Sequence, residues 1–176
     1  MPEPHHQRTL ADTPFPGDDG QADPQIRDRL AAVGSDPESY LRAIAALCTV
    51  RLLVPVVATT TVEGRTEAGL TSDKEAEMAV VLLQTADGRK AMVAFTGLDA
   101  LAAWNSEARP VPVTLDLAAG SARQEAAEAL LIDVGTSHPL AVDGQLLDQL
   151  AAGHRLVELP DGGFGWAVPA DRDQPG

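Results

Sequence analysis

The sequence predicts a single α+β domain with a mixed, mostly antiparallel sheet and three to four helices. A length of 176 residues favours one domain with tails over two complete domains. Hydrophobic residues make up 44% of the chain and charged residues 22%, which is a globular profile. Short β-branched apolar runs are interspersed with segments that repeat at helical spacing, and this mixture predicts a sheet packed against helices. Because aromatic residues make up only 3%, the core must consist of Leu, Val, Ile and Ala.

Composition divides the chain into a leader, a folded domain and a tail. Residues 1–34 are predicted to form a mostly disordered acidic leader, because Pro, Gly and Asp prevail there and little apolar surface can be buried. Apolar residues from Ile26 to Val33 recur at helical spacing and predict one additional short helix in this leader. The predicted domain covers residues 35–168, and residues 169–176 form a loose C-terminal tail.

The first half of the domain begins with a helix and continues with strands. Ser35 and Glu38 form a capping box for a helix that extends to Cys48, with Asp36 before Pro37 as an alternative cap. A β-branched run predicts a strand in which Pro55 removes a ladder donor and indicates an edge position or a bulge. The predicted order after the helix is a strand over 52–61, a loop over 62–75, and strands over 76–85 and 90–95 joined by an Asp-Gly hairpin turn.

The second half alternates helices with extended segments. Thr96 caps its first helix, and two prolines keep the segment after that helix extended. The run over 129–134 is almost fully apolar, which predicts a central strand. In order, the sequence predicts a helix over 98–104, an extended segment over 109–113, a helix over 115–128, strands over 129–134 and 140–142, a helix over 143–152, and a closing hairpin of 156–159 with 164–168.

The charge of the chain argues against two classes of partner. A formal net charge of −13 disfavours nucleic acid, which requires a basic surface, and also disfavours an anionic membrane. No signal peptide is apparent, and no apolar run approaches the roughly 20 residues that span a bilayer. We therefore expect a cytoplasmic protein. Cys48 is the only cysteine, so no intrachain disulfide can form, and its apolar neighbours indicate a buried thiol.

The sequence shows no motif for catalysis, for a cofactor or for a metal. The four histidines lack the convergent spacing of metal ligands, and no nucleophile elbow or phosphate-binding glycine loop is present. We therefore expect no catalytic, cofactor-binding or metal-binding residues. The alternative is a small-molecule binding protein or an enzyme whose site combines Arg51, Arg89 and Arg109 with carboxylates.

A set of aromatic and proline residues, with one arginine, is the candidate interaction surface. Tryptophan and arginine are common in binding hot spots, and rings are rare in this chain. The alternative for the rings is packing against the sheet inside the core. The candidate residues are Phe95, Trp104, Arg109, Pro110, Pro112 and Trp166.

The order of several segments resembles the SseB N-terminal domain family. A helix that runs into an Arg-Leu-Leu-Val-Pro-Val strand is one feature, and a hairpin leading through Phe-Thr into a short helix that ends in Ala-Trp is the most specific. The resemblance covers residues 40–155 and implies an α+β fold. It implies no catalytic residue and no cofactor, because none is established across the family. The matching segments are 46–57, 85–104, 109–113, 131–134 and 140–153.

These observations together predict a non-enzymatic protein-interaction or regulatory module that acts through surface contacts. The expected partner is another protein of unknown identity. A homodimer is an alternative assembly, which would form if the strand from Leu52 to Thr60 were an exposed edge.

Overall fold

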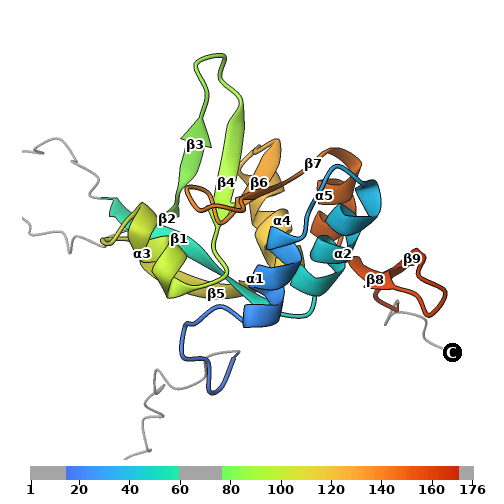
Figure 1. The fold of residues 1–176 in the computed structure, drawn as a ribbon. Coiled ribbons are helices and arrows are strands. Elements are labelled where there is room, and N and C mark those ends of the chain that lie inside the picture. The colour runs from blue at the N-terminus through green and yellow to red at the C-terminus, as the bar shows by residue number, and fades with distance from the viewer. Residues whose placement is uncertain (1–14, 60–76, 171–176) are drawn as a thin grey trace, which may run out of the picture.

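The structure is a computed structural model, and it describes residues 15–59 and 77–170 (Figure 1). The described residues form the helices α1 (Pro24–Ala31), α2 (Pro37–Leu47), α3 (Leu98–Trp104), α4 (Leu115–Gln124) and α5 (Gly144–Ala151). Their strands are β1 (Arg51–Thr59), β2 (Glu77–Val80), β3 (Leu82–Gln84), β4 (Lys90–Ala94), β5 (Arg109–Thr114), β6 (Ala129–Ile132), β7 (Leu140–Asp143), β8 (Arg155–Glu158) and β9 (Phe164–Ala167).

The strands confirm a mixed and mostly antiparallel arrangement. One sheet has the order β2-β1-β5, a second has the order β3-β4-β6-β7, and β8 and β9 form a separate hairpin. Strands β4 and β6 are parallel, whereas all other neighbours are antiparallel. The two larger sheets meet where Leu53 and Phe95 exchange two backbone hydrogen bonds of 2.8 Å. The helices and this sheet arrangement confirm the α+β class.

Two cores lie on opposite faces of β1, because successive side chains of a strand alternate between faces. Leu52 and Val54 belong to the larger core, which α1, α2, α4 and α5 cover. Leu53 belongs to a smaller core together with Phe95 and residues of α3. Figure 1 shows α3 at the left of the sheets and α2 and α5 at their right. Aliphatic residues dominate both cores, as the composition predicts.

The predicted edge position of Pro55 is wrong, because β1 is the central strand of its sheet. Backbone hydrogen-bonding groups alternate in direction along a strand, so Pro55 directs its backbone to the same side as Leu53. On that side Leu53 pairs with Phe95, whereas the carbonyl of Pro55 accepts a hydrogen bond of 3.3 Å from the amide of Val81. The missing N–H of the proline therefore falls where β1 changes from one partner strand to the next.

The hairpin partner of β4 also differs from the prediction. The single strand expected over 76–85 is divided at Val81 into β2 and β3, which belong to different sheets. The strand expected over 129–134 is confirmed as central, since β6 lies between β4 and β7. The loop predicted over 62–75 lies outside the described residues.

Residues 15–34 lie against the domain, although composition predicts disorder for most of residues 1–34. The predicted additional helix is present as α1, which brings the described helices to five. Ile26 and Leu30 of α1 are buried in the larger core. The ordered fold therefore begins earlier than residue 35, while residues 1–14 lie outside the described part.

Two helix caps differ from the prediction. The alternative Asp36 caps α2 in place of Ser35, and Gly97 precedes α3 as its cap in place of Thr96, because the Thr96 hydroxyl is bound to Asp133. Asp36 is the cap of α2 and accepts a 2.7 Å hydrogen bond from the amide of Ser39, while Pro37 occupies the first helical position. None of the described helices is both long and apolar enough to cross a membrane.

Candidate functional site

The predicted aromatic and proline residues do not form one surface. Phe95 is completely buried, and its ring centroid lies 5.5 Å from that of Trp104 in the smaller core. Trp166 lies on β9, packs against the larger core and has His154 at a centroid distance of 6.4 Å. Figure 1 shows β9 and α3 at opposite ends of the molecule. Ring packing in the cores therefore accounts for Phe95 and for much of each tryptophan.

The remaining predicted residues lie on β5, at the outer edge of the first sheet. Arg109 and Pro110 are exposed, and Pro112 is half-buried. The register places Pro110 opposite Pro55 and Pro112 opposite Leu53. Since Leu53 directs its backbone groups away from β5 toward Phe95, these are non-hydrogen-bonded pairs, and both proline nitrogens of β5 face the outer edge.

A cavity of about 260 Å³ borders the two prolines. Its apolar walls come from four separate parts of the chain, and we call it the apolar groove. Leu98 at the start of α3 is 40% exposed there. The groove is lined by Phe15, Leu53, Leu98, Pro110 and Pro112, together with Asp18, Asp19 and Gly20.

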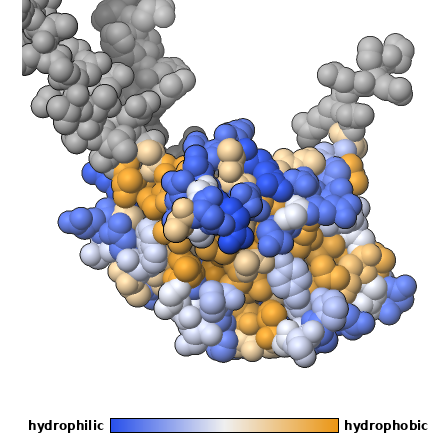
Figure 2. Space-filling model, turned by 90° about the horizontal axis from the view of Figure 1, so that it is seen from above, coloured by the Kyte–Doolittle hydropathy of each residue, from blue (hydrophilic) through white to orange (hydrophobic). Residues whose placement is uncertain are grey.

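Exposed apolar residues alone do not locate a site on this molecule. Figure 2 shows apolar residues in several patches between polar ones on the face seen from above. Large apolar side chains are also exposed at Leu117, Val157 and Val168, on other elements. What sets the apolar groove apart is its hollow shape and the charged segment that borders it.

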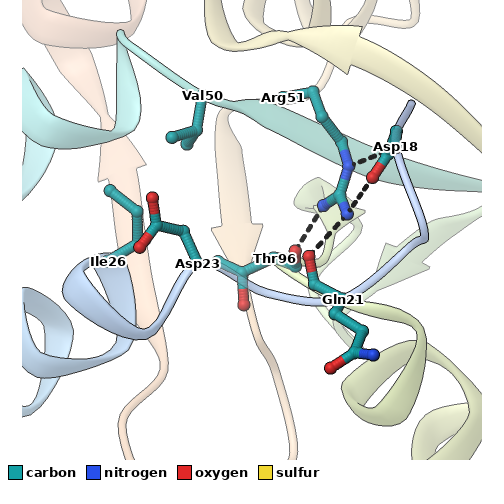
Figure 3. A pocket seen from close by; sticks show the side chains of 7 residues that line it. All are labelled: Asp18, Gln21, Asp23, Ile26, Val50, Arg51 and Thr96. Carbon is teal, nitrogen blue, oxygen red and sulfur yellow. Dashed lines mark hydrogen bonds and ion pairs between the residues drawn. The ribbon is translucent and has the colours of Figure 1, made fainter. Parts of the chain in front are cut away.

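That segment is residues 15–23, which contain no helix or strand and which we call the N-terminal strap. Asp18 of the strap forms a bidentate ion pair with Arg51 at the start of β1, with Nε–Oδ2 and Nη2–Oδ1 distances of 2.7 and 2.8 Å (Figure 3). Arg51 also donates to the backbone carbonyls of Gln21 and Thr96. The Arg51 side chain is only 10% exposed, so its charge lies in a largely desolvated position.

A second cavity, of about 210 Å³, lies beside Arg51, and Figure 3 shows the side chains that line it. Asp18 lines this cavity as well as the apolar groove, so the strap separates the two hollows. The lining side chains come from the strap, from helix α1, from the start of strand β1 and from the segment after β4. The lining residues are Asp18, Gln21, Asp23, Ile26, Val50, Arg51 and Thr96.

Thr96 connects this cavity to a buried carboxylate. Strands β4 and β6 are parallel, so Thr96 and Asp133, which follow their carboxyl ends, come together. Asp133 is 2% exposed and accepts hydrogen bonds from the amide and the hydroxyl of Thr96, at 2.8 and 2.7 Å. The Nε of Arg27 donates to the same hydroxyl at 3.0 Å and lies 3.8 Å from Asp133 Oδ2. Asp133 has a φ of +52°, a left-handed conformation that Asp adopts more readily than most residues.

The ion pairs shift the pKa values of their carboxylates. The hydrogen bonds from Arg51 lower the pKa of Asp18. Arg27 from α1 similarly lowers the pKa of Asp99, which in turn raises the pKa of the Arg27 guanidinium. Both acids are therefore held in their charged form, and each fastens the N-terminal region to the domain.

The three arginines of the alternative site do not converge. The register of the β1–β5 ladder pairs Arg51 with Thr114 and Arg109 with Val56, so these two arginines lie at opposite ends of the ladder. Arg89 lies at the β3–β4 turn, where it forms an exposed ion pair with Asp87. Of the three, Arg51 lines the cavity of about 210 Å³ described above.

The described residues contain no group of three or more His, Cys, Asp or Glu side chains that could hold a metal ion. Cys48 is buried, and desolvation raises the pKa of its thiol. The strap, Thr96, Asp133 and Arg27 were not predicted as site residues. The hydrogen bonds that join these residues to distant parts of the chain span 30 to 78 positions, a separation that no local sequence pattern reveals.

Comparison with protein families agrees with the resemblance found in the sequence. The model of the SseB protein N-terminal domain matches residues 26–149. This match covers well over half of the chain, so the protein belongs to that family. No curated protein and no solved structure is similar enough to the chain to count as a match. The matched range includes Arg27, Arg51, Thr96 and Asp133, whereas the N-terminal strap precedes it.

Proposed function

We propose that this member of the SseB N-terminal domain family is a non-enzymatic protein-interaction module, and that its partner docks in the apolar groove. The observation that carries this proposal is the groove itself: a hollow of about 260 Å³ with apolar walls, bordered by the exposed residues Leu98 and Pro110. Concave apolar surfaces that remain open to solvent are typical places for a partner side chain to be buried.

The edge strand beside the groove determines how a partner binds. A bare strand edge invites another chain to add a strand, because its N–H and C=O groups are unpaired. In β5 the nitrogens of Pro110 and Pro112 occupy two of these outward positions and offer no hydrogen. The partner therefore contacts side chains of this edge and does not extend the sheet. The same argument disfavours a homodimer by strand pairing at β5, and β1 is already paired on both sides.

The electrostatics support a protein partner over other macromolecules. A net charge of −13 repels nucleic acid and anionic membranes, and a cytoplasmic location is consistent with this. Two arginines that hold the N-terminal region are engaged in ion pairs: Arg51 with Asp18, and Arg27 with Asp99.

Site-specific photo-crosslinking in the native cell tests the proposal. A photoreactive amino acid replaces Leu98 at the groove in one variant and Leu117 on α4 in the control. Both residues lie in the first turn of a helix and are solvent-exposed, at 40% and 60%. We expect a discrete heterologous adduct from position 98 that is missing from position 117. Equal adducts at the two positions, or none at position 98, would contradict a groove-specific partner.

A further inference from the structure

We propose that Arg51 is the carboxylate-binding centre of a peptide site, which the N-terminal strap fills in cis and which an acidic peptide segment of a partner protein fills when the strap is displaced. This inference rests on the proposed function and specifies the chemistry of the partner. The ligand carries a carboxylate for Arg51 and, three residues earlier, an aromatic or large apolar side chain for the apolar groove.

Arg51 is preorganised to bind a carboxylate. Its Nη1 donates to the carbonyl of Thr96, which holds the guanidinium plane in place. The edge formed by Nε and Nη2 is then presented as a fork, and Asp18 binds it with both carboxylate oxygens. Such bidentate geometry is the arrangement in which arginine recognises carboxylates most strongly.

The guanidinium of Arg51 depends on the strap for its partners. Its side chain is 10% exposed with the strap in place, and if the strap left, the fork would lose Asp18 and the carbonyl of Gln21, whereas another carboxylate would restore the ion pair. Release of the strap is therefore unfavourable alone but favourable when another carboxylate enters. The site thus selects for an anionic ligand, although the whole chain is acidic.

The strap has the form of a bound peptide. It lies along the domain without regular secondary structure, as a bound peptide does, and the amide of Leu98 donates a 2.8 Å hydrogen bond to the carbonyl of Gly20. Gly20 has a φ of +79°, and a Cβ at this residue would lie 2.2 Å from Leu98 Cδ1, so the strap approaches α3 as closely as glycine allows. Phe15 lines the apolar groove, and Asp18, three residues later, lies between the groove and the Arg51 cavity.

The two sides of the site differ in their relation to the family match. The receptor side, which includes Arg51, Thr96 and Leu98, lies within residues 26–149 that match the family. The strap, which supplies Phe15 and Asp18, precedes that range. The binding surface therefore lies inside the matched range, whereas the segment that fills it lies outside.

A tethered segment competes with a free ligand through its effective concentration, which is on the order of millimolar for a short linker. Replacing Asp18 by Asn keeps the size of the side chain but removes the charge that pairs with Arg51. We expect the full-length D18N variant to bind a free strap-like peptide at least about ten-fold more tightly than the wild type does. Because one ion pair is formed, this gain should decrease as salt is added.

The test uses fluorescence anisotropy with a labelled peptide that has the sequence of residues 15–23. The control peptide carries Asn in place of the aspartate that corresponds to Asp18. A matched protein control, D19N, removes the neighbouring carboxylate, which accepts a hydrogen bond from the amide of Gln21 within the strap. Of these two variants and two peptides, we expect tight binding only for D18N with the aspartate-containing peptide. Equal affinities of D18N and D19N, or indifference to the aspartate of the peptide, would overturn the proposal.

A second variant keeps the test independent of any effect of D18N on folding. F15A leaves every charge in place and weakens the hold of the strap on the groove, so it too should bind the peptide more tightly than the wild type. Circular dichroism establishes that each variant is folded. A groove-specific crosslink without peptide binding would refute this inference and leave the proposed function intact. Peptide binding without a crosslinked partner would refute the proposed function and leave this inference intact.

Discussion

Replacing Thr96 by valine should weaken the fold strongly, although valine has nearly the same shape as threonine. The Thr96 side chain is buried between β4 and α1, where its hydroxyl donates to Asp133 and accepts from Arg27. Valine removes both hydrogen bonds and leaves Asp133 with the amide of residue 96 as its remaining bond from that residue. The carboxylate stays 2% exposed and so recovers little hydration from solvent.

The expected loss follows from these contacts. A hydrogen bond to a charged group contributes about 1.5–3 kcal/mol, and T96V loses two such bonds, although the amide of residue 96 still donates to Asp133. We therefore expect the free energy of unfolding to fall by about 3 kcal/mol, as measured by urea denaturation followed by tryptophan fluorescence and circular dichroism.

Thr49→Val is the matched control for this measurement. Its hydroxyl donates a 2.7 Å hydrogen bond to the carbonyl of Ala46, but at an exposed position where water replaces the lost partner. We expect this variant to change the free energy of unfolding by less than about 1 kcal/mol. If T96V lost no more than T49V, the buried Thr96–Asp133–Arg27 cluster would not stabilise the N-terminal region as argued.

Three further measurements test individual groups. Arg51 lowers the pKa of Asp18 in the folded state, so this ion pair stabilises the protein above the unfolded aspartate pKa of about 3.9, and the stabilisation is lost as the pH falls through the folded pKa. The urea midpoint of D18N should therefore depend less on pH in the acid range than the midpoint of the wild type. If the urea midpoints of the two proteins changed equally with pH, the result would contradict the ion pair. Tyr40 is the only tyrosine, and burial raises its pKa to about 12. Ultraviolet titration of the phenolate in the folded protein should therefore have its midpoint near 12, and a midpoint near 10 would mean that Tyr40 is not buried in solution. Cys48 should react slowly with a thiol reagent in buffer and rapidly in urea, because it is buried and its thiol pKa is raised; equal rates would show that the α2 end opens readily.

Local sequence patterns were sufficient to predict most helices and strands of the fold. The start of α2 at Pro37, the Asp-Gly hairpin turn and the apolar run of β6 each depend on neighbours within a few residues, and the structure contains all three, whereas the caps predicted at Ser35 and Thr96 are replaced by Asp36 and Gly97. The family resemblance, read from the order of these elements, was confirmed by the family match over residues 26–149.

Strand order was harder to predict, because it depends on pairing between distant segments. The rule that proline favours an edge misplaced Pro55, which is tolerated in a central strand where β1 changes its partner. Likewise, the aromatic and proline residues could be recognised as unusual, but only the fold separates the buried Phe95 and the distant Trp166 from the exposed Pro110.

The sequence by itself determined the class of the fold, the family and the acidic character of the chain, because these depend on composition, periodicity and the order of elements. Only the tertiary structure decided where a binding site can lie. It joined Asp18 to Arg51 across 33 positions and Thr96 to Asp133 across 37, and it set the strap beside Leu98 and the prolines of β5. The physical reason is that an ion pair or a groove requires atoms within a few ångströms, and folding alone brings such distant residues together.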